Sequence, residues 1–214
     1  MSPYQYAANN PILYIDMNGD SIIFSQAFLK DDNSIDIFNK WANTDAGKSF
    51  MINYGAGGKH EDVSVTFDVG DLEAGTKGST EAFAVDKDGN QTNLADEGTI
   101  KGLKDRGYDV SNIKSTLGKG EYLKFNLTLD RVSKTDSEYV KRNRQETLTH
   151  EAQHVILGTM DIKKDGTVTW SGKDQHRIMK SNNALIQQRF NVLKSARPDL
   201  KDDKIRESVN AFED

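Results

Sequence analysis

The sequence predicts an α+β fold, in which a small mixed or antiparallel sheet packs on one long helix and further helices follow at the C-terminus. Two segments, 62–69 and 122–129, place apolar residues at alternate positions, which is typical of strands buried on one face. A segment from Thr135 to Leu157 has helical spacing, begins with a Thr-x-x-Glu capping box and is followed by Gly158 as its expected end. With 214 residues, the chain is long enough for one sizeable domain or two small ones.

In the N-terminal half, the apolar pattern predicts helices first and a hairpin later. A helical segment is expected at 22–28, and helical spacing recurs within 37–51. Residues 81–94 are predicted to form a hairpin, because an Asp-Gly-Asn turn separates two arms that carry apolar residues. Residues 95–120 are rich in glycine and lysine and are expected to form loops with one short helix.

The C-terminal half is predicted to be mainly helical. Strand 122–129 precedes the long helix, and we interpret it as an edge strand to which an extended peptide could add. A second tight hairpin is expected at 162–168, around an Asp-Gly turn. A long helix is then predicted at 175–196, ended by a proline, and a weaker one at 201–212.

Composition and charge argue against several classes of function. The formal net charge is −5 and the basic residues are not clustered, which disfavours binding to nucleic acid or to an anionic membrane surface. No apolar run is long enough to span a bilayer, and no signal peptide is recognisable in this sequence. Because the chain has no cysteine, any zinc site has to use histidine and carboxylate ligands.

One motif carries chemistry, the run His150-Glu151-Ala152-Gln153-His154 inside the predicted long helix. Residues four apart lie on the same side of a helix, so both imidazoles can bind one Zn²⁺ ion. Glu151 is placed to take a proton from a zinc-bound water and to pass it to a leaving amine. This motif on a helix is typical of zinc peptidases, so the expected fold is zincin-like. The alternative is a helix with two incidental surface histidines.

A catalytic zinc ion usually has three protein ligands, and the sequence offers two candidates for the third. His176 is favoured, because imidazole is the more frequent ligand and this residue opens the next predicted long helix. Asp161 is the alternative, at the entrance of the second hairpin. Asp174 and Gln175 stand beside His176 and are candidates to orient an imidazole.

Three further residues have both a functional and a structural interpretation. Tyr139 could stabilise an oxyanion, although a place in the core is more usual for a tyrosine. Glu146 lies one turn before His150 and could orient it, although a solvated surface position is more usual. His60 follows a glycine-rich stretch and is expected to be an exposed loop residue.

Residues 3–20 read PYQYAANNPILYIDMNGD. This segment resembles the end of the RHS-repeat-associated core, a family whose shell ends in a segment like SPYxYxxNNPIxxIDPxG before a variable C-terminal toxin. Met17 stands where that family usually has proline, a difference that concerns the shape of the junction turn. The match is dense but covers less than a tenth of the chain.

The resemblance implies that residues 1–20 are the tail of a much larger core, at a junction where self-cleavage can release the toxin. Residues 21–214 are then the effector domain, a zincin-like metallopeptidase. The resemblance also implies delivery into a neighbouring cell by a specialised secretion system, often type VI in Gram-negative bacteria. The partners that it implies are the remainder of the RHS shell and a cognate immunity protein.

The motif and the resemblance together predict a zinc-dependent peptidase that acts as a secreted toxin on a protein or peptide substrate. One alternative keeps the zinc and changes the bond, which makes the chain an amidase acting on cell-wall peptide. Another is a non-catalytic binding or adhesion tip, in which the histidines are incidental. Cleavage of nucleic acid is disfavoured by the acidic balance.

Overall fold

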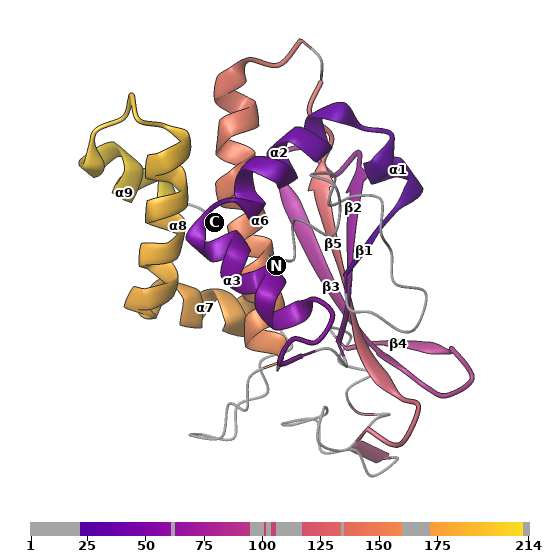
Figure 1. Cartoon of the computed structure of the whole chain (residues 1–214). Coiled ribbons are helices and arrows are strands. Elements are labelled where there is room, and N and C mark those ends of the chain that lie inside the picture. Colours follow the sequence, from indigo (N-terminus) through magenta and orange to yellow (C-terminus); the bar gives the residue numbers. More distant parts are fainter. Residues whose placement is uncertain are drawn as a thin grey trace.

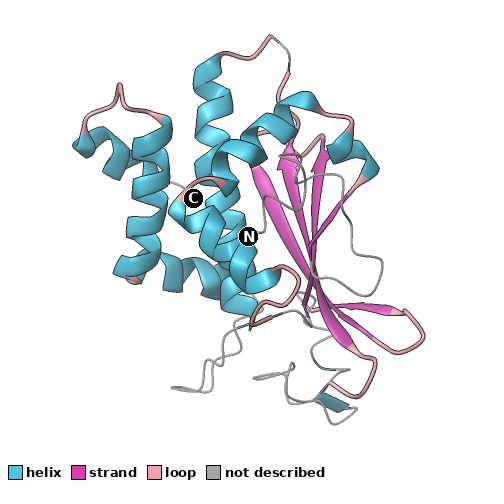
Figure 2. Cartoon of the chain, viewed as in Figure 1, coloured by secondary structure: helices cyan, strands magenta, loops and turns pink. Residues whose placement is uncertain are grey.

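The computed structural model describes residues 22–60, 63–94, 101, 104–105, 117–133, 135–159 and 172–211. A five-stranded sheet forms one layer, and most of the helices pack together on one side of it (Figures 1 and 2). The elements are, in chain order, β1 (Ile22–Phe24), α1 (Gln26–Leu29), α2 (Asp32–Ala42), α3 (Asp45–Tyr54), β2 (Val63–Gly70), β3 (Gly78–Val85), β4 (Gln91–Asn93), β5 (Tyr122–Asp130), α6 (Glu138–Thr159), α7 (Gly172–Ser181), α8 (Asn183–Ala196) and α9 (Asp202–Asn210). The α+β class predicted from the sequence is confirmed.

The sheet is mixed, with the strand order β1-β2-β5-β3-β4. β1, β2 and β5 run parallel, whereas β3 runs antiparallel to both β5 and β4. β5 therefore lies in the middle of the sheet, and the interpretation of it as an edge strand is wrong. Alternating burial shows that one face of a strand is covered, but it does not show whether both of its backbone edges are paired.

An aromatic cluster joins the sheet to the first helices. The inward side chain of Phe67 on β2 is fully buried and meets Phe24, Phe38 and Trp41 at ring-centroid distances of 5.6, 5.0 and 6.1 Å. On the neighbouring strand β5, Phe125 faces the same core and is 1% exposed. This core fixes the sheet against α1, α2 and α6 and so determines where α6 lies.

Both predicted strands and the predicted hairpin are present. β2 and β5 agree with the expected 62–69 and 122–129 to within one residue at each end. The hairpin consists of β3 and β4, with Gly89 in the left-handed region at a φ of 84°. β3 begins at Gly78, three residues earlier than expected, and these extra residues approach α6.

Two helix predictions are wrong in their bounds. Ile22–Phe24 is a strand that pairs with β2, and the helix starts only after Ser25, whose side chain accepts a hydrogen bond from the Phe28 amide. The long helix predicted at 175–196 is two helices, because Asn182 interrupts it and caps α8 by accepting from the Ala184 and Leu185 amides. The break gives α7 a direction of its own (Figure 1).

The bounds of α6 also differ from the prediction. It starts at Glu138 instead of directly after Thr135, so the predicted capping box does not form, and it continues through Gly158 to Thr159. Among the described residues, no helix is both long and apolar enough to cross a membrane. The segment that resembles the RHS core, the predicted hairpin at 162–168 and most of the predicted loop at 95–120 lie outside the described residues.

Candidate metal centre

The central part of α6 is buried around its whole circumference. β3 and α2 pack on it, and α8 lies along it (Figure 1). Its buried residues include the strongly polar His150, Glu151, Gln153 and His154, which are 0–9% exposed. The two histidines are therefore not the incidental surface residues of the alternative interpretation. Buried polar groups are costly unless they find partners, so their concentration here points to a functional site.

Three imidazoles converge at this part of α6. The Nε2 atom of His154 lies 3.2 Å from Nε2 of His150, one helical turn away, and 3.1 Å from Nε2 of His176 on α7. One ring nitrogen from each residue lies within 4.8 Å of the others. Two nitrogens bound to one tetrahedral zinc ion at ~2.0–2.1 Å are about 3.3–3.4 Å apart. The three side chains could therefore hold a metal ion with little movement.

Gln175 determines which ring nitrogen of His154 carries the proton. Its Oε1 lies 2.6 Å from Nδ1 of His154, and its Nε2 donates to the His154 backbone carbonyl at 3.5 Å. An amide oxygen only accepts hydrogen bonds, so Nδ1 of His154 carries the proton and the lone pair of Nε2 points to the other two histidines. Gln175 was expected to orient an imidazole, and it does so for His154. The side chain of Asp174 lies outside the described residues.

A buried ion pair lies behind His150. The guanidinium of Arg189, on α8, is 3.5 Å from Nδ1 of His150 and 3.9 Å from Oε1 of Glu146. Both charged residues are almost fully buried, at 1% and 3% exposed. The expectation of a solvated Glu146 is therefore wrong. The contact of Arg189 with His150 and Glu146 was not predicted. The spacing of Arg189 puts it on the apolar face of its helix, and a buried arginine there needs a partner, which is a signal that the sequence does contain.

Burial keeps two of the imidazoles neutral. It lowers the pKa of His150 to about 2, helped by the neighbouring charges of His154, Arg189 and His176. Burial also lowers the pKa of His154 to about 4, against the opposing effect of the Gln175 hydrogen bond. Only a neutral imidazole can bind a metal ion through its lone pair. These two histidines are therefore in the form that ligates a metal at neutral pH.

Glu151 lies against β3. The Thr80 hydroxyl is 2.7 Å from Oε2 of Glu151 and 3.2 Å from its backbone carbonyl oxygen. Two residues earlier on the same strand, Gly78 approaches the carboxylate so closely that a Cβ there would lie 2.8 Å from Oε1. The strand thus contacts both carboxylate oxygens, a contact that was not predicted from the sequence.

The remaining candidates from the sequence do not join the three histidines. Tyr139 lies in the first turn of α6, about 16 Å along the helix axis from His150, and its half-exposed ring stacks on the guanidinium of Arg197 at 3.7 Å. His60 is half-buried and stacks on Tyr54 at a centroid distance of 4.9 Å, so it is less exposed than expected. Asp161, the alternative third ligand, lies outside the described residues.

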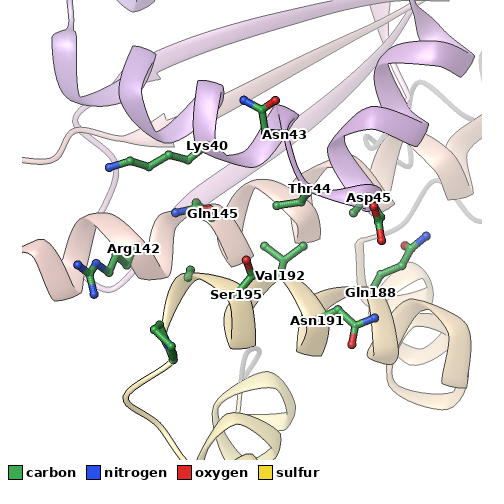
Figure 3. A pocket seen from close by; sticks show the side chains of 13 residues that line it. Lys40, Asn43, Thr44, Asp45, Arg142, Gln145, Gln188, Asn191, Val192 and Ser195 are labelled. Carbon is green, nitrogen blue, oxygen red and sulfur yellow. The ribbon is translucent and has the colours of Figure 1, made fainter.

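A groove lined mainly by polar residues lies elsewhere, between the α2–α3 corner and α8, with α6 as its floor (Figure 3). Its volume is about 740 Å³, and Lys40, Gln145 and Asn191 are among its lining residues. None of the three histidines lines it. The groove and the histidine cluster are therefore separate features of the molecule.

Comparison with known proteins identifies no relative. No family model, no curated protein and no solved structure matches the chain.

Proposed function

We propose that this chain is a zinc-dependent peptidase of zincin-like fold, with His150, His154 and His176 as zinc ligands. The observation that carries the proposal is the convergence of three imidazole nitrogens on α6 and α7, with Glu151 next to the first of them. Three protein ligands leave one position on a tetrahedral ion, which is the arrangement of catalytic and not of structural zinc. The mixed sheet beside the motif helix supports the zincin-like assignment.

A bound zinc ion would lower the pKa of a coordinated water to ~7 and polarise the scissile carbonyl. The residues of the chain supply the rest of the mechanism. Glu151 accepts the proton of the attacking water and then donates it to the leaving amine, which completes hydrolysis of the peptide bond. Gln175 keeps the proton of His154 on Nδ1, so that Nε2 is available to the ion.

The edge of β3 is suited to hold an extended substrate next to Glu151. β4 pairs with β3 only at Phe83, Ala84 and Val85, and the Leu94 amide extends the contact to the Ala82 carbonyl. Residues 78–81 are paired with β5 on their inner side, and no described strand pairs with their outer side. A peptide that adds there forms main-chain hydrogen bonds and lies beside the carboxylate. The proposed site of strand addition is therefore on β3 and not on β5, where the sequence suggested it.

We assign this peptidase the role of a toxin, as the effector domain of a secreted polymorphic toxin. The support is the resemblance of residues 3–20 to the end of the RHS-repeat-associated core. The proposal includes delivery into a target cell by a specialised secretion system, with the remainder of the RHS shell and a cognate immunity protein as partners.

The first experiment measures zinc by elemental analysis in the purified wild type, His176→Ala and Asp161→Ala. We expect one zinc ion per wild-type chain, retention in Asp161→Ala and loss in His176→Ala. Loss in Asp161→Ala alone would make that residue the third ligand. A wild type that binds no zinc even after its addition would contradict the proposal and favour a binding tip.

The second experiment measures hydrolysis of a labelled denatured protein and of peptidoglycan fragments by the wild type and Glu151→Gln. We expect zinc to remain bound in Glu151→Gln and turnover of the protein substrate to fall at least ~100-fold, the lower range for a general acid–base group. Full activity of Glu151→Gln would exclude the mechanism. Hydrolysis of the peptidoglycan fragments alone would identify the chain as an amidase.

A further inference from the structure

We infer that Thr80 is a positioning residue that holds Glu151 in the orientation needed for proton transfer, an inference that rests on the proposed peptidase function. Thr80 lies on β3, in a different layer of the fold from the motif helix, and is separated from Glu151 by 71 positions in the sequence. The HExxH motif places the backbone of Glu151 but leaves its side-chain torsions undetermined. A contact from outside the helix is needed to fix them.

The hydrogen bond from Thr80 has a clear direction. A threonine hydroxyl has one hydrogen, and the Oε2 atom of Glu151 is nearer, at 2.7 Å, than the backbone oxygen at 3.2 Å. The Thr80 hydroxyl donates to Oε2, and in the ionised form that the proposed general base requires, this bond is charge-assisted and stronger than a neutral one. This bond holds Oε2 against β3.

Gly78 fixes the same carboxylate by contact. The space where its Cβ would lie is occupied by Oε1 and Cγ of Glu151, at 2.8 and 2.9 Å. Gly78 and Thr80 are two positions apart on a strand, so both face α6. Strand β3 therefore restricts the side chain of Glu151 at two positions. The backbone of Gly78 lies against the carboxylate, and the hydroxyl of Thr80 donates a hydrogen bond to it.

The arrangement links substrate and base through one strand. The outer edge of residues 78–81 is the proposed place for the substrate backbone, and the face of the same residues that meets α6 holds Glu151. α6 then places the backbone of Glu151, and β3 sets the orientation of its carboxylate relative to the bound peptide. A carboxylate that is displaced from the attacking water lowers the rate of hydrolysis, because proton transfer requires a hydrogen-bond distance between the two groups.

The test compares Thr80→Val, which keeps the shape of threonine without the hydroxyl, with Thr80→Ser, which keeps the hydroxyl. Thr128→Val is the matched control, because Thr128 lies on β5 and pairs with Ser79, on the opposite face of the sheet. With a labelled denatured protein as substrate, we expect kcat of Thr80→Val to fall about 10- to 100-fold with KM within about twofold. Thr80→Ser and Thr128→Val should stay within about threefold of the wild-type kcat, and all variants should bind one zinc ion.

A structural readout separates this inference from the proposed function. In crystals of the metal-free proteins, the Glu151 carboxylate should have one conformation against β3 in the wild type and Thr80→Ser, and several in Thr80→Val. An unchanged kcat in Thr80→Val, or an equal loss in Thr80→Ser, would overturn the inference. If the wild type shows no peptidase activity, the proposed function fails, and an unchanged Glu151 conformation in Thr80→Val would still count against Thr80.

Discussion

The two sides of α6 are equally buried and chemically opposite. On one side Leu148, Ala152 and Val155 are 0–3% exposed and belong to the main hydrophobic core below the sheet. On the other side His150 and His154 are 3% and 9% exposed and meet polar groups from α7 and α8. Burial of the first side stabilises the fold, whereas burial of the second opposes it until partners are supplied. The two sides should therefore respond differently to mutation.

The largest expected effect on folding comes from the apolar side. Leu148→Ala should lower the free energy of unfolding by about 2–5 kcal/mol, because it leaves a cavity in a fully packed core. Urea denaturation of the metal-free protein measures this change. The control is Ile52→Ala, because Ile52 is 67% exposed on α3, and it should change stability by less than about 0.5 kcal/mol. Zinc content should be unchanged in both variants. Loss of the metal in a folded Leu148→Ala variant would show that metal binding on the polar side depends on packing on the apolar side.

The next effect concerns the polar side. Gln175→Ala should weaken zinc binding about 10- to 100-fold, because nothing then holds the proton of His154 on Nδ1. Competition with a chelator of known affinity measures the change. Gln187→Ala is the control, since Gln187 is exposed on α8 and its side chain donates to Asn191. Wild-type affinity in Gln175→Ala would show that the site does not depend on this hydrogen bond.

The last comparison concerns the dependence of stability on pH. Burial lowers the pKa of His150 to about 2 and that of His154 to about 4, so between pH 6.5 and 4 the unfolded chain binds protons that the folded chain does not. Stability of the metal-free protein should therefore fall as pH drops below about 6.5, by up to about 1.4 kcal/mol per pH unit for each histidine.

Denaturant titrations at pH 7, 6 and 5 measure this dependence. Asp199 also has a lowered pKa, of about 2, through its hydrogen bonds from Arg197, but its contribution is lost only below pH 4, as pH falls through that value. The titrations at pH 7, 6 and 5 all lie above that range and therefore report the histidines. Equal stability at pH 7 and pH 5 would show that the histidines are not buried in the neutral form.

The sequence predicted those parts of the fold and site that depend on local spacing. Strands β2 and β5 were located by alternation, and the side-by-side placement of His150 and His154 follows from helical geometry. His176 was favoured as the third histidine, and the structure brings it next to the other two. Its role as a ligand stays a prediction, as does the identity of the metal.

What could not be predicted depends on contacts between distant segments. The central place of β5 follows from its pairing with β2 and β3, which its own residues do not encode. The buried pair of Arg189 and Glu146 requires that α8 lie along α6. The contact of Thr80 with Glu151 joins a hairpin to the motif helix, and a single sequence gives no signal for such a pair.

The placement of the three histidines on two helices has a consequence for the stability of the domain. An ion bound by His154 and His176 would cross-link the chain and close the segment between them into a loop, which restricts the unfolded state. A disulfide could do the same, but the chain has no cysteine. Formation of this cross-link would therefore depend on the free zinc concentration and not on the redox state of the surroundings. A domain that reaches a new compartment unfolded and metal-free would gain this restraint only where zinc is available.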